Sequence, residues 1–595
     1  MRAILNGLPK VWILKFRELI LKLLDYLKIS ETKILVSLSI VVGLASGLGA
    51  YLFRWLIGEF QDFFFGLGGS ALFFLKGYYV ILVPAIGGAI VGPLIYFFAR
   101  EAKGHGVPEV MLAVAHYGGR IRPRVALVKA LASSICIGSG GSVGREGPIV
   151  QIGSAIGSTI GQLLNVPSEL IRTLVACGAA GGISATFNAP IAGVLFSLEV
   201  ILRDFSTRAF SMVVLASVTA AAISRALMGN YPAFRVPSYS LKSPWELVIY
   251  LVFGIIAALI AKLFVKTLYR FEDVFDAWRF PEYLKPIAGG FLIGGIGLFF
   301  PHIFGVGYET IEAVLMGKMA LSIIAVLVFI KILATSITIG SGGSGGIFAP
   351  SLFIGAMLGS VYGSMVNYLF PDITAPAGAY SLVGMGAVFA GAAEAPITSI
   401  LILFEMTGDY RIILPLMVSS VTSALASHMI NPETIYTLKL RRRGIDISQA
   451  KLSDILVQVK VKDVMSTNIK LATEHMTLEE LAEFFKQYKY TSFPVVDSRE
   501  KLVGFVGYAE IHDALLSNPS LDETRVKDIM KTQVPTAFTD ENLSEVVAKF
   551  KAYNTGRIPV VSRLDRRKVV GVISHSDVLN YYYEFFQIRV SDRKH

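Results

Sequence analysis

Cysteine is scarce in this chain, and so are charged side chains. Only 2 of its 595 residues are cysteines, Cys136 and Cys177, and both stand in apolar, Gly-rich segments. So few cysteines exclude a disulfide framework, and we interpret both as small core residues. Charged residues make up 17% of the chain, where a soluble protein carries about a quarter. With 53% hydrophobic residues and a mean hydropathy of +0.60, much of the chain is expected to lie in lipid.

The hydropathy divides the chain into parts. Apolar runs fill residues 34–446, interpreted as a transmembrane domain, whereas 455–585 has the pattern of soluble α/β sequence. Residues 1–33 are basic and are predicted to form an amphipathic helix on the inner membrane surface, and 586–595 is a short tail.

The formal net charge of +11 is concentrated beside the membrane segments. Part of the excess lies in the basic N-terminal segment, and part directly after the last apolar run, at Lys439, Arg441, Arg442 and Arg443. The positive-inside rule therefore predicts a multi-pass protein, expected in the plasma membrane, with both termini in the cytoplasm. No signal peptide and no nucleic-acid partner are expected.

The apolar runs differ in length. The long ones are 34–58, 78–99, 210–228, 246–268, 285–301 and 320–339. Shorter runs, broken by Gly and Pro, are 107–117, 149–164, 171–187, 190–201, 348–368, 377–392, 396–406 and 411–430. Runs too short to cross the bilayer predict helices that stop part-way, as in channels and transporters with discontinuous helices.

One Gly-rich turn occurs twice. Gly138–Ser158 and Gly340–Ser360 share eleven identities in twenty-one ungapped positions. Consecutive glycine N–H groups just before a helix can form an anion cradle, and the first copy also carries a glutamate, Glu146, within an apolar region.

A second match follows in the same order. Ala189-Pro-Ile191 with Glu199 corresponds to Ala395-Pro-Ile397 with Glu405, and the spacing from Pro to Glu is nine in both. The predicted fold is therefore a polytopic α-helical membrane protein with an internal repeat of broken, tilted helices. The repeat is inverted if each half crosses the membrane an odd number of times. Its two halves span about 34–230 and 245–430.

Four motifs in order resemble the CLC family of chloride channels and chloride/proton exchangers over about 35–445. They are Gly104-His-Gly-Val-Pro-Glu109, Gly144-Arg-Glu-Gly-Pro148, Gly346-Ile-Phe-Ala-Pro350 and Glu405-Met-Thr-Gly408. The resemblance implies transport of chloride or another small anion, not an enzyme, and a homodimer in the lipid bilayer with one pore per subunit.

By that resemblance Glu146 is the gating glutamate, which occupies an anion site and leaves it when chloride or a proton arrives. A carboxylate on a turn of aligned N–H groups is a tethered anion, and protonation removes its charge. Arg145 adds positive charge beside the gate, and Lys129 matches the basic residue near the pore. A structural glutamate paired with Arg145 or Lys129 is the alternative.

The resemblance also implies an anion site between the two turns. Backbone amides and one tyrosine hydroxyl attract an ion moderately and let it leave. Tyr436 is the expected hydroxyl, with an interfacial anchor as the alternative. Glu146 should face Ile347 and Phe348 across a common anion. The full predicted set is His105, Gly106, Arg145, Gly147, Gly346, Ile347, Phe348, Ala349 and Tyr436.

Two positions depart from the family pattern. His105 replaces a hydroxyl residue, so its ring either points inward as a donor or points away. Val200 stands where exchangers usually carry a proton-transfer glutamate, and valine cannot carry a proton. This favours a glutamate-gated, voltage-gated chloride channel, with a chloride/proton antiporter as the alternative.

The soluble region contains a repeat at sixty-five residues. Val461–Met465 returns as Val526–Met530, and Phe493–Val496 returns as Ile558–Val561. Each unit is predicted to be a helix, a Pro-led strand, a turn, a second strand and a helix. The pair resembles tandem CBS domains, which often bind adenine nucleotides. The predicted units are 455–517 and 522–585.

No cofactor is required, and the expected nucleotide contacts are Ser574 and Asp577 in the second unit. A purely structural tail is the alternative. A CBS-regulated divalent-cation channel is a distant one, because it would need acidic side chains facing one pore. A dinucleotide-binding enzyme is not supported, because no alternating βα pattern surrounds the Gly-rich turn.

Overall fold

The protein is described by a computed structural model. The described residues are 31–68, 77–230, 234, 236, 237, 239–445, 456, 459–488, 490–517 and 524–581. Residues 1–30 of the predicted N-terminal helix and the predicted tail over 586–595 lie outside them. The chain forms two compact units, Met1–Ile447 and Ser448–His595, and each is described by itself.

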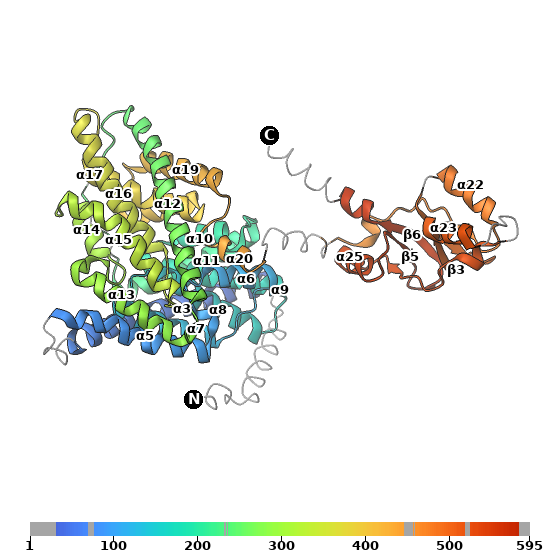
Figure 1. Ribbon diagram of the computed structural model, residues 1–595, viewed down its shortest axis with the longest axis horizontal. Helices are drawn as coiled ribbons and strands as arrows, with labels where there is room; N and C mark the ends of the chain where they lie inside the picture. The colour runs from blue at the N-terminus through green and yellow to red at the C-terminus, as the bar shows by residue number, and fades with distance from the viewer. Residues whose placement is uncertain are drawn as a thin grey trace. The chain divides into compact units, whose positions relative to one another are not determined.

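The first unit is built from helices in two halves that repeat one order of elements (Figure 1). The first half contains α3 (Glu31–Gln61), α5 (Tyr79–Phe98), α6 (Val107–His116), α7 (Arg124–Gly138), α8 (Glu146–Leu163), α9 (Ser168–Phe187), α10 (Pro190–Phe196) with the π-helical η4 (Ser197–Leu202), and α11 (Thr207–Met228). The second contains α12 (Glu246–Ala277), α13 (Lys285–Phe299), α14 (Tyr308–Leu315), α15 (Leu321–Gly340), α16 (Phe348–Leu369), α17 (Ala377–Ala393), α18 (Pro396–Thr407) and α19 (Ile413–Ile430). A short helix, α20 (Thr437–Arg442), follows.

Among the described residues, eight helices are long and apolar enough to cross a membrane. Helices that stop part-way are confirmed for α6, α10 with η4, α17 and α18, which have ten to seventeen residues. The same prediction is wrong for α9, α16 and α19, which have 20, 22 and 18 residues and are long and apolar enough to cross a membrane. The unit is therefore a polytopic helical membrane protein.

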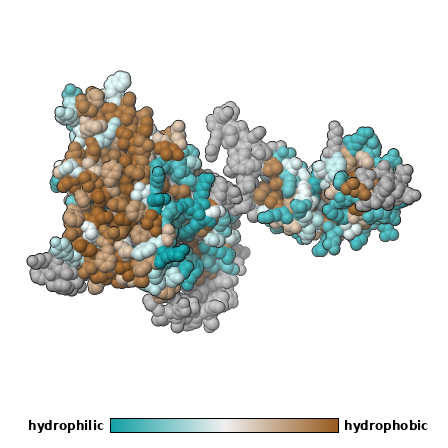
Figure 2. Space-filling view, viewed as in Figure 1, coloured by the Kyte–Doolittle hydropathy of each residue, from teal (hydrophilic) through white to brown (hydrophobic). Residues whose placement is uncertain are grey.

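Two of the long helices carry outward apolar stripes. On α12 the exposed residues Leu251, Ile255, Leu259 and Leu263 follow one another at intervals of four. Residues four apart lie on one face of a helix, so this face is available to lipid. The same spacing on α19 exposes Met417, Val421, Leu425 and Met429. Figure 2 shows a broad hydrophobic surface on this unit.

Glycines allow helices to pack closely at equivalent places in both halves. A Cβ on Gly153 of α8 would meet the carbonyl oxygen of Gly178 on α9. A Cβ on Gly355 of α16 would likewise meet the carbonyl oxygen of Gly384 on α17. Small residues at such crossings let two backbones approach within lipid, so the sequence repeat has a matching repeat in helix packing.

The second unit consists of two small α/β halves. The first contains β1 (Ala472–Thr473), α22 (Leu478–Tyr488), β2 (Ser492–Val496), β3 (Leu502–Gly507) and α23 (Tyr508–Ser517). The second contains α24 (Val526–Ile529), β4 (Ala537–Phe538), α25 (Leu543–Ala552), β5 (Arg557–Val561) and β6 (Val569–Ser574), with helical residues 575–581 after it. Helix α22 buries Leu478, Leu481 and Phe485, the spacing of an amphipathic helix.

Each half forms a three-stranded sheet, in the orders β1-β2-β3 and β4-β5-β6. The Pro-led strands β2 and β5 lie in the middle, pairing in parallel with the short first strand and antiparallel with the third. The predicted hairpin is confirmed, but β1 and β4 are additions to it. Backbone bridges Ser466–Val572 and Phe505–Lys531 join the halves, so each half completes the other.

Candidate anion site

The two Gly-rich turns pair with each other in the interior of the helical unit. The Gly144 N–H donates to the Gly346 carbonyl at 2.7 Å, and the Gly346 N–H donates to the Gly144 carbonyl at 2.6 Å. Helix α7 ends at Gly138 before Gly140 turns the chain at φ +95°, and α15 ends at Gly340 before Gly342 turns it at φ +106°. The turns therefore bring the N-termini of α8 and α16 together.

This pairing changes one predicted role. The Gly346 amide was expected to face the anion, but it is directed at Gly144 because the two turns form a reciprocal backbone pair. The first N–H groups of α8 and α16 have no partner within their helices and carry the positive end of the helix dipole. The amides of Gly147, Ile347, Phe348 and Ala349 are thus the donors available at the crossing.

Glu146 is the first residue of α8, and its side chain lies at the start of α16. The residue is 3% exposed. Its Oε1 accepts from the Tyr308 hydroxyl at 2.7 Å, and its Oε2 accepts from the Ala349 N–H at 3.3 Å. The carboxylate therefore occupies the kind of place, at a helix N-terminus, that favours a free anion.

The two cations proposed as alternative partners of Glu146 have other contacts. The Arg145 guanidinium packs over the ring of Tyr308, 5.2 Å from its centroid. The buried Lys129 donates through Nζ to the carbonyls of Ala102 and Gly104 at 3.0 and 2.7 Å. Lys129 therefore holds the backbone that leads into the His105 turn.

Five of the predicted site residues, Glu146, Gly147, Ile347, Phe348 and Tyr436, border one cavity between the halves. Its polar groups are a carboxylate, the helix N-termini and one phenol, and the rest of its wall is apolar. Such a wall excludes water and strengthens each polar contact inside it. The lining residues are Val107, Glu146, Gly147, Val150, Ile183, Phe187, Phe196, Ile347, Phe348, Ile402 and Tyr436.

His105 lies next to this cavity. The residue is 1% exposed, and its ring centroid lies 5.9 Å from that of Tyr436. Neither ring nitrogen has a hydrogen-bond partner among the described residues. The ring is also absent from the lining, whereas a Cβ on Gly147 would meet the His105 carbonyl oxygen. Gly147 thus allows the His105 backbone to approach α8 closely.

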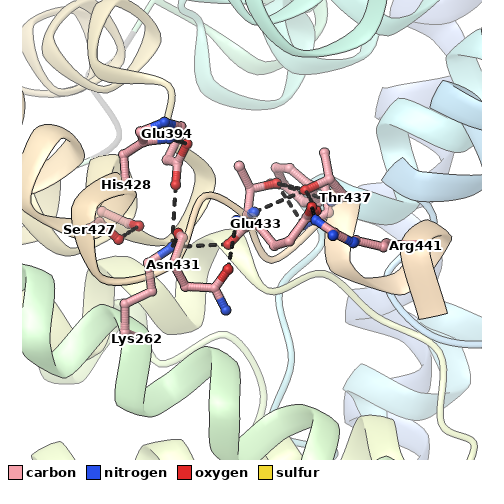
Figure 3. Close-up of polar contacts among 11 residues, drawn as sticks. Lys262, Glu394, Ser427, His428, Asn431, Glu433, Thr437 and Arg441 are labelled. Carbon is pink, nitrogen blue, oxygen red and sulfur yellow. Dashed lines mark hydrogen bonds and ion pairs between the residues drawn. The ribbon is translucent and has the colours of Figure 1, made fainter. Parts of the chain in front are cut away.

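Tyr436 is buried, and a polar network holds the segment before it (Figure 3). Lys262 of α12 donates through Nζ to the carbonyls of Asn431 and Glu433 at 2.8 and 2.9 Å, and forms an ion pair with Glu394 at 3.3 Å. The Glu433 carboxylate accepts from Thr437 and Arg441 at 2.7 and 2.5 Å. These contacts fix the backbone on both sides of Tyr436, so its position is set by the fold. An interfacial anchor would be exposed.

Sequence reasoning missed a second buried lysine. Lys331 of α15 donates through Nζ to the carbonyls of Ile303 and Gly305 at 3.0 and 3.2 Å. Lys129 makes the equivalent pair of bonds, to other carbonyls, in the first half. The signal was present, because Lys129 and Lys331 are separated by the same 202 residues as Gly138 and Gly340.

Two glutamates of the repeat cap helices of the opposite half. Glu199 accepts from the N–H groups of Ile397 and Thr398 at 3.3 and 2.8 Å. Glu405 accepts from Ile191 and Ala192 at 3.0 and 2.7 Å. Each therefore joins the two halves. Val200, on the same turn as Glu199, is buried among apolar residues.

The predicted nucleotide residues lie at the end of β6. Asp577 accepts through Oδ2 from the Ser574 N–H and hydroxyl at 2.8 and 2.6 Å. In the first half Glu510 takes this place and also contacts Lys531 Nζ at 2.6 Å. Burial opposes ionisation of Glu510, but the bonds from Lys531 and the Gly507 N–H outweigh it and lower its pKa. The two halves therefore carry a carboxylate at equivalent places but differ in its partners, a serine for Asp577 and a lysine for Glu510.

Comparison with known proteins gives consistent results. A family model described as voltage-gated chloride channel matches residues 87–428, and a CBS-domain model matches 461–517 and 526–584. A ClcB-like chloride channel protein of Ralstonia nicotianae is 33% identical over 418 residues, which cover 68% of this chain and 96% of that protein. The H+/Cl− exchange transporter ClcA of Vibrio vulnificus is 35% identical over 363 residues, 59% of this chain and 76% of that protein. The solved structure of a slow cyanobacterial Cl−/H+ antiporter matches with a TM-score of 0.64 at 26% identity, covering 70% of this chain and 98% of that one.

Proposed function

The chain belongs to the voltage-gated chloride channel (CLC) family, and from that premise we propose that it exchanges chloride for protons across a membrane. The observation that carries the proposal is the Glu146 carboxylate at the N-terminus of α16, held by Tyr308 and Ala349. A tethered anion in this place competes with a free one. A proton that neutralises Glu146 removes its charge, so anion entry and proton uptake become linked.

The relatives support exchange over the passive channel that Val200 favoured. The exchange transporter of Vibrio vulnificus and the cyanobacterial antiporter both carry proton coupling in their names. Val200 cannot bind a proton, so exchange requires another carrier on the inner side. Glu199, its neighbour, is held by N–H donors of α18 and by the Thr398 hydroxyl at 2.6 Å. Val200, which cannot bind a proton, is the one observation that keeps a passive channel as the second candidate.

Chloride would bind between Glu146 and Tyr436. The anion would be bound by the tyrosine hydroxyl and by the backbone amides of Gly106, Gly147, Ile347, Phe348 and Ala349. His105 and Arg145, which lie behind these donors, would add to the electrostatic potential at the anion. None of these donors except Arg145 is a full cation, which suits an ion that must leave again. Apolar walls of the cavity support partial dehydration of the anion.

We further propose a homodimer in the plasma membrane with both termini in the cytoplasm. The basic residues after α19 support this orientation. The CBS pair would act on transport from the cytoplasm, and an adenine nucleotide at Ser574 and Asp577 would be a regulator and not a required cofactor.

Reversal potentials test exchange against channel conduction. The full chain is reconstituted into planar bilayers with a fixed chloride gradient while the proton gradient is varied. Exchange predicts a reversal potential that moves with the proton gradient. A potential that follows chloride alone at every proton gradient would make the protein a channel.

A further inference from the structure

Tyr308 provides the only side-chain hydrogen bond to Glu146 among the described residues. Its hydroxyl donates to Oε1 at 2.7 Å, across 162 positions of sequence. The tyrosine is the first residue of α14, and its ring packs edge-on against the buried Phe234 at 5.0 Å and beneath Arg145 at 5.2 Å. Two packed groups therefore fix the ring, and the hydroxyl is directed at the gate.

The internal repeat gives a comparison for this contact. Helix α6 begins at Val107 after Gly106 at φ +83°, and α14 begins at Tyr308 after Gly307 at φ +83°. Val107 and Tyr308 are thus counterparts. Glu146 and Phe348, the first residues of α8 and α16, are counterparts as well.

These four positions form one polar pair and one apolar pair. Glu146 contacts Tyr308, whereas their counterparts Phe348 and Val107 border the cavity as two apolar side chains. Tyr308 gives the Glu146 carboxylate a hydrogen-bond donor. Its counterpart Val107 has no side-chain donor, and Phe348, the counterpart of Glu146, needs none. This matching is what a functional contact predicts, since buried polar groups are retained only with partners.

We propose that Tyr308 is a positioning residue that holds the Glu146 carboxylate in the anion site and must release it in each transport cycle. The inference rests on the proposed function of Glu146. A hydroxyl that donates to a carboxylate stabilises the charged form of the carboxylate. This stabilisation is lost when the glutamate side chain is protonated or displaced. Tyr308 therefore sets the proton concentration at which the gate opens.

Other charged and titratable groups act on the same place. Arg145 precedes Glu146, Arg54 of α3 interacts with Arg145 and Tyr308, and Lys331 and Tyr436 interact with Glu146. Two of these cations, Arg145 and Lys331, favour the ionised carboxylate whatever residue stands at 308. Removal of one hydroxyl therefore shifts the gate's proton dependence and leaves the gate in place.

Tyr308→Phe tests the inference, because it keeps the ring and its packing and removes only the hydroxyl. We expect the pH at half-maximal chloride flux in liposomes to move upward by about one unit, since a hydrogen bond to a charged group has been lost. The matched control is Tyr239→Phe. The Tyr239 hydroxyl donates to the Leu315 carbonyl at the other end of α14, at 2.6 Å, so this control weakens the same helix without touching Glu146.

The Glu146→Ala background separates positioning from a general structural effect. There Tyr308→Phe should leave the residual flux and its pH profile unchanged. An unshifted midpoint in Tyr308→Phe, or an equal shift in the Glu146→Ala background, would overturn the inference. If the unsubstituted protein carries no chloride, the proposed function fails instead.

A fluorinated tyrosine at position 308 covers the case in which Tyr308→Phe does not fold. Its more acidic hydroxyl is a stronger donor, so the midpoint should move downward, opposite to the change expected for Tyr308→Phe. A midpoint that stays in place would also contradict the role assigned to Tyr308.

Discussion

Glu146, Glu199 and Glu405 each lie at a helix N-terminus inside the membrane unit, and their contacts distinguish the proposed gate from two helix caps. Glu199 and Glu405 each receive two adjacent backbone N–H groups of one helix, which fixes both carboxylate oxygens. Glu146 receives one N–H and one side-chain hydroxyl from different helices. Because a side-chain donor can move away more easily than a helix end, Glu146 is held in a more releasable way than Glu199 and Glu405.

Glu405→Gln should lower stability and leave the gate's pH dependence unchanged. The glutamine keeps one acceptor oxygen but loses the charge that the α10 N-terminus favours, at a cost of about 1–2 kcal/mol. Thermal unfolding of the purified full chain measures this loss, with Glu59→Gln at an exposed position of α3 as the control. Equal melting temperatures for the two variants would contradict the capping role.

At the residue scale, sequence reasoning singled out residues whose motifs are local, and the structure brings Glu146 and both Gly-rich turns together. Glu146 and the Gly-rich turns could be predicted because the chemistry is carried by adjacent residues. Tyr308 could not, since nothing near it in sequence indicates a carboxylate, and only the fold brings it to Glu146. Gly346 was assigned wrongly because its amide is taken by a turn 202 residues away.

Among the helices, close packing determines where the proposed anion site can form. The crossings of α8 with α9 and of α16 with α17 hold the two N-termini at one point, and both depend on facing glycines. The short helices α10 and α18 then join the halves through the reciprocal caps. Helix lengths were predicted less well, because residues 168–170 and 369 contribute to helices without being part of an apolar run.

Gly153→Ala should destabilise the protein by about 1–3 kcal/mol, because the added methyl meets the Gly178 carbonyl in a packed crossing. Gly295→Ala in α13 is the matched control, since a Cβ there has nothing within 4 Å. Alanine at an open helical position adds about 1 kcal/mol of stability. Gly153→Ala should lower the melting temperature, and Gly295→Ala should raise it. An unchanged melting temperature in Gly153→Ala would contradict a rigid crossing of α8 and α9.

On the scale of the whole molecule, two internal repeats account for both units. The offset of the membrane repeat predicted two halves, and the offset of sixty-five residues predicted two CBS units. Strands β1 and β4 were missed because two residues carry no alternating pattern. The bridges between the CBS halves also lay outside sequence reasoning, since they are backbone contacts without a side-chain signal.

Asp577→Asn should weaken binding of ATP to the full chain by about tenfold, or about 1.4 kcal/mol. The carboxylate is expected to bind the ribose hydroxyls, and an amide is a poorer acceptor. Calorimetric titration measures the affinity, and Glu510→Gln at the equivalent place of the first half is the control. A loss in the control variant, with none in Asp577→Asn, would move the nucleotide site to the first half.

Proton uptake driven by a chloride gradient in liposomes tests the central claim most directly. The full chain should move protons against their gradient. Glu146→Gln, which cannot be protonated, should keep chloride flux and stop proton movement. Glu309→Gln, at an exposed position beside Tyr308, should behave like the unsubstituted protein. Proton uptake that persists in Glu146→Gln would contradict the assignment of Glu146 as the shared gate for chloride and protons.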